Sequence, residues 1–401
     1  MIEEKIAIEK VISTTPDPIM CNMPVEEAHC SFLLKDVKAM RSSPIVNQSA
    51  MDGYGIRVRD KKFSNLEIIG ESLAGNPYKT EVNEGESVRV LTGANIPKGV
   101  DAVVMQEDCD VIDGKLFVND LPKEGQFIRK IGEVFSEGQT IARKGKKINS
   151  PTIAAIISAG VFEVSISQKI RVGVITTGDE VKSIANDELK DFEIYNSNQY
   201  MIKSAVNELG IENVSFAHVV DDEAKTRDVI KKMLNKHDIL IVSGGISVGK
   251  KDLIRGSLQN CGVKEEFWRV KIKPGKPIFY GTYNNGCQVF GLPGNPVSSY
   301  VGFLIFVLPA LRIRMGMPKD QIGLENVKFE LSKDIINKGD RVNYTMGEIN
   351  EMKELHLHGK QTSNNILGLS NSNVLIRVDP NSTLSKGETV QGYLLLSLIH
   401  I

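Results

Sequence analysis

The sequence predicts a multidomain protein of the α/β plus β class, with a parallel-sheet α/β domain between a β-rich N-terminal region and a small C-terminal β barrel. Residues 169–318 alternate β-like runs with segments of helical spacing, which is typical of a parallel sheet with helices on both faces. Residues 37–168 and 319–401 contain instead short β-like runs separated by turns. A chain of 401 residues is long enough for about two to four domains.

The N-terminal region is expected to begin as a helix and to continue as hairpins. Residues 1–36 have helical apolar spacing, and Pro16 is expected to end that run because proline cannot continue a helix. Residues 37–168 are rich in glycine and hold short β-like runs. The dipeptide Asp113-Gly114 is typical of the turn of a β hairpin, so this region is predicted to be built from hairpins.

The α/β region is expected to alternate strands and helices. The predicted strands and helices follow one another at 170–176, 196–209, 214–220, 222–235 and 238–242. Gly210 is expected to end the first helix as a C-cap, and the second helix opens with acids and ends with bases, as the helix dipole favours. Ligands of parallel α/β sheets bind at the carboxyl ends of the strands, so a site is expected there.

Composition excludes some classes of protein. With 49 basic and 50 acidic residues the formal net charge is -1, which argues against nucleic-acid binding through bulk charge. The five cysteines form no C-x-x-C pair, and their odd number does not suit a disulfide framework. Free thiols in a reducing cytoplasm are therefore expected.

No membrane segment is expected either. The N-terminus has alternating charges and no apolar run, so it does not resemble a signal peptide. The most apolar stretch, 297–311, contains Ser298 and Ser299 and reaches Pro309. Since a bilayer needs roughly 20 apolar residues, this stretch is predicted to be a buried helix.

Two predicted strand ends carry turns suited to an anion. The first turn, TTGDE at 176–180, presents Gly178, Asp179 and Glu180. The second, at 243–249, presents Ser243, Gly244, Gly245 and Ser247, and Asp252 follows it. Glycines let the main chain approach a ligand, amides at a helix start favour phosphate, and nearby acids suggest a divalent cation. The structural alternative is a pair of tight turns in which Asp252 caps a helix.

Two proline-stiffened segments follow the α/β repeats. KPGKP at 273–277 presents Lys273 and Lys276, whose fixed positive charges suit a phosphate or another oxyanion. GLPGNPVSS at 291–299 precedes the apolar helix, and its candidate binding residues are Pro293, Asn295, Pro296 and Ser298. Taken alone, the first segment is better explained as a solvated turn, and the second is explained equally well as a structural turn.

Motifs in the β-rich region identify no reaction by themselves. SAMDGY at 49–54 contains Asp52, but Asp-Gly is ordinarily a hairpin turn. LTGA at 91–94 contains Thr92, whose hydroxyl can donate a hydrogen bond.

These motifs together resemble the molybdopterin molybdenumtransferase (MoeA) family, which includes the gephyrin E domain. SAMDGY, LTGANIPKGVDAVVMQED, TTGDE, SGGISVGKKD, KPGKP and GLPGNPVSS occur in the order and approximate spacing of that family. The resemblance covers nearly the whole chain. It implies a linking domain from 1–36 and 132–168, a β-rich domain at 37–131, an α/β domain of the molybdopterin-binding fold at 169–318, and a β barrel at 319–401.

The resemblance also implies an activity and its partners. Adenylylated molybdopterin and molybdate would be converted into molybdenum cofactor with release of AMP, assisted by Mg²⁺. The protein would be a cytoplasmic homodimer with a cleft shared between subunits, and it would contact the pterin adenylyltransferase transiently. The alternatives are a pterin adenylyltransferase activity, a scaffold without catalysis, and tungstate in place of molybdate.

The family's functional positions map onto particular residues of this chain. Asp52, Glu180 and Asp252 would hold the cation, Lys273 and Lys276 would hold an oxyanion, and a further set completes the site: Thr92, Pro293, Pro296 and Ser363. The chain departs from the family pattern at four positions. Val134 replaces an acid, Met346 replaces an arginine, and Thr362 and Asn364 replace the residues flanking Ser363. These departures suggest a divergent paralogue with lower activity, an altered metal choice or another anion.

Overall fold

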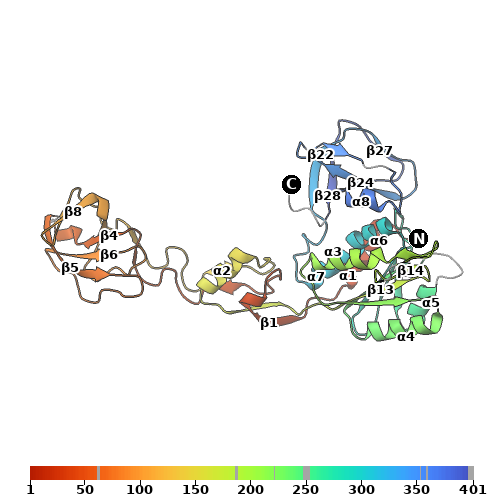
Figure 1. The fold of residues 1–401 in the computed structure, drawn as a ribbon, viewed down its shortest axis with the longest axis horizontal. Coiled ribbons are helices and arrows are strands. Elements are labelled where there is room, and N and C mark those ends of the chain that lie inside the picture. Colours follow the sequence, from red (N-terminus) through yellow and green to blue (C-terminus); the bar gives the residue numbers. More distant parts are fainter. Residues whose placement is uncertain are drawn as a thin grey trace.

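The computed structural model describes residues 1–60, 64–185, 188–220, 222–246, 253–352, 354–357 and 360–395. Figure 1 shows an elongated molecule with a β sheet at one end, a narrow middle, and a broad end that holds the α/β sheet and the C-terminal strands. The chain runs from the broad end to the far sheet and back again: its first helix and its last described strand both lie at the broad end (Figure 1).

The distal sheet has six strands in the order β7-β4-β6-β5-β9-β8. They are β4 (Gly53–Ile56), β5 (Ser64–Ser72), β6 (Glu86–Val90), β7 (Ala102–Met105), β8 (Cys109–Ile112) and β9 (Lys115–Val118). β8 and β9 form an antiparallel hairpin, and Asp113 and Gly114 between them have φ of 50° and 75°. Two positive φ angles suit a tight hairpin turn, so the predicted turn is confirmed.

The narrow middle consists of segments from two parts of the chain. β1 (Met20–Pro24) pairs with β12 (Glu163–Ser167), β2 (Val37–Lys38) with β11 (Thr140–Ala142), and β3 (Gln48–Ser49) with β10 (Ile128–Arg129), all antiparallel. Helix α2 (Ser150–Ser158) begins where the Asn149 side chain accepts a hydrogen bond from the Thr152 amide. Asparagine at this position satisfies an amide that the helix leaves free.

The expectation that residues 1–36 are helical is wrong beyond the first helix. Helix α1 (Glu4–Thr14) ends before Pro16, as predicted, but β1 follows it. The helix also lies apart from the linking region that was expected to contain it. Its buried residues Ala7 and Val11 belong to the core of the α/β region, because they pack with the helix that ends that region.

The central sheet of the broad end has the order β16-β13-β17-β21-β20-β18. Its strands are β13 (Val172–Thr177), β16 (Val214–Val219), β17 (Ile239–Ser243), β18 (Lys264–Trp268), β20 (Phe279–Thr282) and β21 (Gln288–Leu292). Strands β16, β13, β17 and β21 are parallel, which confirms the predicted β-α-β-α-β core. The sheet is not wholly parallel, however, because β20 and β18 join it as an antiparallel hairpin.

Helices cover both faces of this sheet. Helix α3 (Ser197–Asn207) and the long helix Pro296–Arg314 pack on one face, whereas α4 (Glu223–Leu234) and α5 (Leu253–Asn260) pack on the other. The long helix comprises α6 (Pro296–Gly302), a π-helical turn at Phe303–Val307, and α7 (Leu308–Arg314). It is long and apolar enough to cross a membrane, but 83% of its most apolar window is buried in the protein. This confirms the predicted buried helix.

The C-terminal strands form a sheet in the order β19-β24-β26-β28-β22, with β25 also paired to β24. The elements are β22 (Asn326–Glu330), β23 (Ile335–Asn337), β24 (Val342–Ile349), β25 (Leu355–His356), α8 (Ile366–Ser370), β26 (Val374–Val378), β27 (Ser382–Leu384) and β28 (Thr389–Leu394). Strand β19 (Ile272–Lys273) comes from the α/β region. A closed barrel stays a prediction, since the pairing runs as an open path among the described residues.

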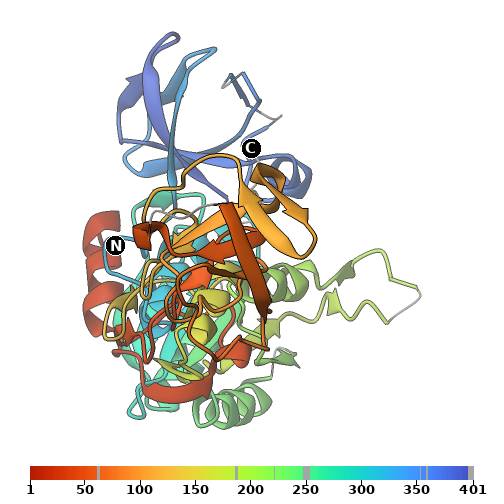
Figure 2. The same cartoon turned by 90° about the vertical axis from the view of Figure 1, so that its left-hand side faces the viewer.

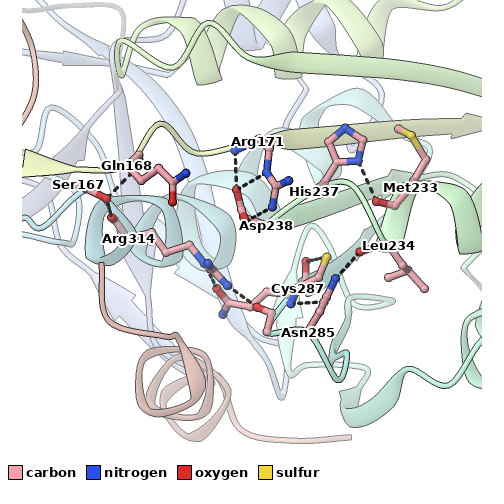
Figure 3. A network of polar contacts seen from close by, with 12 residues as sticks. Ser167, Gln168, Arg171, Met233, Leu234, His237, Asp238, Asn285, Cys287 and Arg314 are labelled. Atoms are coloured by element: carbon pink, nitrogen blue, oxygen red, sulfur yellow. Dashed lines mark hydrogen bonds and ion pairs between the residues drawn. The ribbon is translucent and has the colours of Figure 1, made fainter. Parts of the chain in front are cut away.

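A network of polar contacts joins the middle to the α/β region at the amino ends of the strands (Figure 3). The Ser167 hydroxyl donates to the Arg314 carbonyl at 2.6 Å, and the buried Arg314 guanidinium donates to Gln288 at 2.9 Å. Arg171 and Asp238 form a two-point ion pair beside them. These contacts brace one edge of the sheet and leave the carboxyl ends of the strands at the opposite edge for a site.

Candidate active site

The first cavity of the candidate site lies at the carboxyl ends of β13, β17 and β21. It has a volume of about 480 Å³. Its lining includes eight of the predicted site residues: Gly178, Glu180, Ser243, Gly244, Gly245, Pro293, Asn295 and Pro296. The two predicted strand-end turns therefore meet, as expected for neighbouring parallel strands.

Glycine is required in the second turn. Gly244 and Gly245 have φ of 98° and 61°, in the left-handed region that side chains disfavour. A Cβ at Gly244 would lie 2.8 Å from the Thr177 hydroxyl oxygen, and one at Gly245 would lie 2.7 Å from an Ile254 side-chain carbon. The main chain thus passes close to the first turn and lines the cavity without side chains.

Two asparagines that the sequence analysis did not single out position these turns. Asn196 caps α3 by accepting from the Gln199 amide, and it also donates to the Thr176 hydroxyl at 2.8 Å. Asn198 donates to the Ser243 hydroxyl at 2.9 Å and to the Gly294 carbonyl at 2.7 Å. The start of α3 is therefore tied to all three strand ends. The N-S-N sequence at the start of the predicted helix was the available signal.

A second cavity of about 470 Å³ adjoins the first. The two cavities share Pro277, Pro293 and Asn295. The second cavity is lined by the predicted residues Lys273, Lys276, Ser298 and Ser363, and also by Arg341, Asn343 and Gln361. Its described lining contains three cationic side chains and no aspartate or glutamate, which suits an oxyanion.

The wall between the two cavities joins the α/β region to the C-terminal sheet. The Asn295 amide donates to the Ser363 hydroxyl at 2.8 Å, and the Val297 main-chain amide donates to the Ser363 carbonyl at 3.2 Å. Gln361 pairs with both main-chain groups of Met346, accepting from its amide and donating to its carbonyl. These bonds hold the segment around Ser363 between α6 and β24, so Ser363 faces a cavity built by two regions.

Asp52 and Thr92 form a separate polar unit in the distal region. One Asp52 carboxylate oxygen accepts from the Thr92 amide at 2.6 Å and from the Thr92 hydroxyl at 2.8 Å. These two bonds, with the positive charge of Arg89, hold the pKa of Asp52 below its usual value, so the exposed carboxylate stays ionised. Gly53 starts β4 instead of forming a hairpin turn. A Cβ there would lie 1.8 Å from the Val104 carbonyl oxygen.

The predicted site residues are thus divided between two ends of the molecule. Asp52 directly precedes β4, which lies at the opposite end from β13 (Figure 1). Within the described ranges of one chain, no group of three histidine, cysteine or acidic side chains is placed to hold a metal. Asp179 is exposed at its turn and does not line the first cavity. Ser247 and Asp252 lie outside the described residues.

The two central departures from the family pattern have different surroundings. Val134 is 69% exposed on the middle region, so it fills no apolar pocket. Met346 is only 1% exposed and lines the second cavity, where it presents a thioether instead of a charge.

The geometry of the two cavities defines a class of protein. A glycine-lined cavity at parallel strand ends, next to a cationic one, is typical of an enzyme that binds a phosphorylated ligand together with a second anion. Two family models match the chain: the MoeA N-terminal region (domain I and II) at residues 2–160, and a probable molybdopterin binding domain at residues 173–313.

Whole-chain relatives agree with these matches. The chain is 32% identical to the molybdopterin molybdenumtransferase of Haemophilus influenzae, over 96% of this chain and 96% of that protein. It is 31% identical to that of a Nostoc species, over 90% of this chain and 86% of that protein. Two crystal structures of a molybdopterin biosynthesis MoeA protein from Pyrococcus horikoshii superpose with TM-scores of 0.84 and 0.81. They are 26% and 27% identical over 98% of this chain and 99% and 100% of those chains. The chain belongs to the molybdopterin molybdenumtransferase family.

Proposed function

We propose that this protein is a transferase of molybdenum cofactor biosynthesis, which inserts molybdate into adenylylated molybdopterin and releases AMP. Membership of the molybdopterin molybdenumtransferase family supports this role. The observation that carries it is the pair of adjoining cavities. One cavity offers glycine amides and hydroxyl groups, and the other offers three cationic side chains, so a phosphorylated pterin and an oxyanion fit side by side.

The first cavity is proposed to bind the phosphate-bearing part of the substrate. Gly244 and Gly245 allow close approach of the main chain, and Ser243 and Asn198 keep the turn in place. In the second cavity, Lys273 and Lys276 attract molybdate. Pro293 and Asn295 border both cavities, so the reacting groups would meet there.

A divalent cation, Mg²⁺, is proposed to assist the reaction. Carboxylates are the ligands that Mg²⁺ prefers, and the ionised Asp52 fits this role because one of its oxygens accepts no hydrogen bond from Thr92. Asp52, Glu180 and Asp252 would hold the cation. When bound, the cation would withdraw charge from the phosphorus and make AMP a better leaving group.

The enzyme is proposed to act as a homodimer with a shared cleft. In one chain β4, which directly follows Asp52, lies at the opposite end from β13, which shortly precedes Glu180, so an arrangement in which the two acids act together needs a second copy (Figure 1). The middle region exposes apolar side chains that a partner would cover: Met40, Ile131, Val134 and Phe162. Transient contact with the pterin adenylyltransferase is a further expectation from the family.

The direct test mixes the purified protein with adenylylated molybdopterin, molybdate and Mg²⁺, and measures AMP and molybdenum cofactor. The proposal expects both products in equal amounts. Pyrophosphate formed from ATP and molybdopterin would indicate an adenylyltransferase, and no turnover despite substrate binding would indicate a scaffold. Replacing molybdate with tungstate in the same assay shows which oxyanion the protein prefers.

A further inference from the structure

We propose that Trp268 is a positioning residue for the first cavity, because it holds the second glycine turn of that cavity in place. This inference rests on the proposed function, in which the first cavity binds the phosphate-bearing part of the substrate. Trp268 is the only tryptophan of the chain, and it lines neither cavity. It would therefore act through the turn and not through contact with a ligand.

Trp268 ends β18 at the same edge of the central sheet as the first cavity. β18 and β21 both pair antiparallel with β20, so they run in the same direction and their carboxyl ends share one edge. The first cavity lies at this edge, at the end of β21. The indole N–H of Trp268 donates to the Ile246 carbonyl at 3.2 Å. An outer strand of the sheet thus contacts the glycine turn that follows β17.

Ile246 is the last described residue of this turn and is fixed at two points. Its carbonyl accepts the hydrogen bond from Trp268, and its side chain, 2% exposed, fills the space where a Cβ on Gly291 would lie. The start of the turn is also held, because the Gly244 amide donates to the Leu292 carbonyl at 3.0 Å. Glycines restrict the main chain little, so a turn that contains two of them depends on such contacts to keep one conformation.

Two arginine side chains stack on the indole of Trp268. The guanidinium carbons of Arg255 and Arg269 lie 4.1 and 4.0 Å from the ring centroid. A cation at this distance from the face of a tryptophan is attracted by the π electrons of the ring. Arg255 is itself oriented by Glu265, whose two carboxylate oxygens accept from it at 2.8 and 3.0 Å. The indole is therefore held in the orientation that places its N–H on Ile246.

Trp268 also joins two segments that flank residues 247–252, which lie outside the described residues. Ile246 directly precedes these residues, and Arg255 lies in α5, which directly follows them. Trp268 contacts both, through its N–H on one side and its ring on the other. Loss of the indole would therefore release the end of the glycine turn and the start of α5 from each other.

The experiment compares Trp268→Phe, Arg255→Gln and Phe216→Leu with the wild type. Trp268→Phe keeps an aromatic ring for the arginines and removes the N–H donor. Arg255→Gln keeps the indole and removes one cation that stacks on it. Phe216→Leu is the matched control variant. Phe216 is half-buried on β16 of the same sheet with Lys203 over its ring, and it lines neither cavity.

The probe is AMP, and its dissociation constant is measured by calorimetry. Trp268→Phe is expected to weaken AMP binding about 3- to 10-fold, as the loss of one hydrogen bond implies. Arg255→Gln should also weaken AMP binding, and it should lower the fluorescence anisotropy of the single tryptophan because the indole gains freedom. Phe216→Leu should bind AMP like the wild type. Molybdate binding, which reports on the other cavity, should be the same in all four proteins.

A residue that only stabilises the fold would lower the melting temperature without changing the AMP affinity of the folded protein. An AMP dissociation constant in Trp268→Phe equal to that of the wild type would therefore overturn the inference, as would an equal loss in Phe216→Leu. If Trp268→Phe does not fold, Arg255→Gln decides the question, and unchanged AMP affinity in that variant would overturn it.

Failure of this inference differs from failure of the proposed function. If only the inference fails, the wild type still releases AMP from adenylylated molybdopterin in the presence of molybdate, and Trp268→Phe binds AMP equally well. If the proposed function fails, the wild type itself releases no AMP.

Discussion

The distal region and the broad end of the molecule each carry half of what the proposed reaction needs. The distal region has an acid held ionised by two hydrogen bonds from Thr92, but Asp52 lines neither of the two cavities. The broad end has two adjoining cavities with amides, hydroxyls and cations, and the one acid in their described lining is the exposed Glu180. Within one chain, the carboxylate proposed to hold the cation is thus far from the cavities proposed to hold the substrates.

In the proposed mechanism the work is divided between the two regions. The broad end would bind the substrates, because its glycine turns, braced by Asn196 and Asn198, line a cavity at the strand ends. The distal end supplies a preorganised carboxylate on a rigid sheet, where Gly53 packs against the carbonyl of Val104. Within the described residues of one chain, neither end holds the whole set of proposed site residues, which is the physical reason to expect a second subunit.

The largest effect is expected from Asp52→Asn, which tests whether the distal acid takes part at all. The change keeps the size of the side chain and removes its charge, so AMP release should fall at least about 100-fold while the melting temperature stays the same. The matched control is Asp110→Asn, an exposed acid on β8 of the same sheet, which should retain full activity. Turnover of Asp52→Asn at the wild-type rate would remove the distal region from the mechanism.

A smaller effect is expected at the broad end from Lys276→Met. Loss of one cation from the second cavity should raise the KM for molybdate about tenfold. A charge-assisted hydrogen bond contributes roughly 10- to 100-fold to affinity, and the expected change is at the lower end of that range. The affinity for AMP should not change, since Lys276 does not line the first cavity. Steady-state rates over a series of molybdate concentrations provide the measurement. An unchanged KM would place the anion elsewhere.

Thr92→Val tests the distal region further, because it removes the hydrogen bond from the Thr92 hydroxyl to the Asp52 carboxylate. The Thr92 amide lowers the pKa of Asp52 most, and the Thr92 hydroxyl lowers it further. A lowered pKa keeps the carboxylate charged as the pH falls, until the pH passes that pKa. Without the hydroxyl the pKa rises, so the acidic limb of the activity profile should move to higher pH. Thr92→Ser keeps the hydroxyl and should leave the limb unmoved; equal shifts in both variants would refute this role.

The smallest effect is expected from Val134→Asp in the middle region. Val134 is 69% exposed, so an added carboxylate stays hydrated and the melting temperature should not change. If the middle region contributes to the shared cleft, the Mg²⁺ concentration for half-maximal activity should fall by a few-fold, since nearby acids alter metal affinity. A stable variant with unchanged Mg²⁺ dependence would show that Val134 lies outside the site.

The sequence predicted the parts of the fold that follow from local patterns. The alternation of strand-like and helix-like segments predicted the parallel core. Asp113-Gly114 predicted a hairpin, and the length of the apolar stretch at 297–311 predicted a buried helix. The antiparallel β18–β20 hairpin and the placement of α1 were missed. The placement of α1 depends on contacts between distant segments, such as the packing of Val11 in the α/β core, which no local pattern encodes.

The candidate site was predictable to a similar extent. Glycine and proline motifs marked both strand-end turns and the cationic segment, since such residues are needed wherever the main chain turns sharply at a ligand. Asn198 was not singled out, although it lies in the N-S-N sequence at the start of a predicted helix. Its partners, Ser243 and Gly294, are distant in sequence, so its role appears only once the fold brings them beside it.

Complementation between two inactive variants tests the shared cleft most directly. Asp52→Asn damages the distal end and Glu180→Gln damages the broad end, so each pure dimer would have no intact cleft. After subunit exchange in an equal mixture, half of the dimers would be mixed and each would hold one intact cleft of two. AMP release should then recover to about one quarter of the wild-type rate. No recovery, in a mixture where exchange is verified by native mass spectrometry, would mean that both acids act within one chain and would contradict the account.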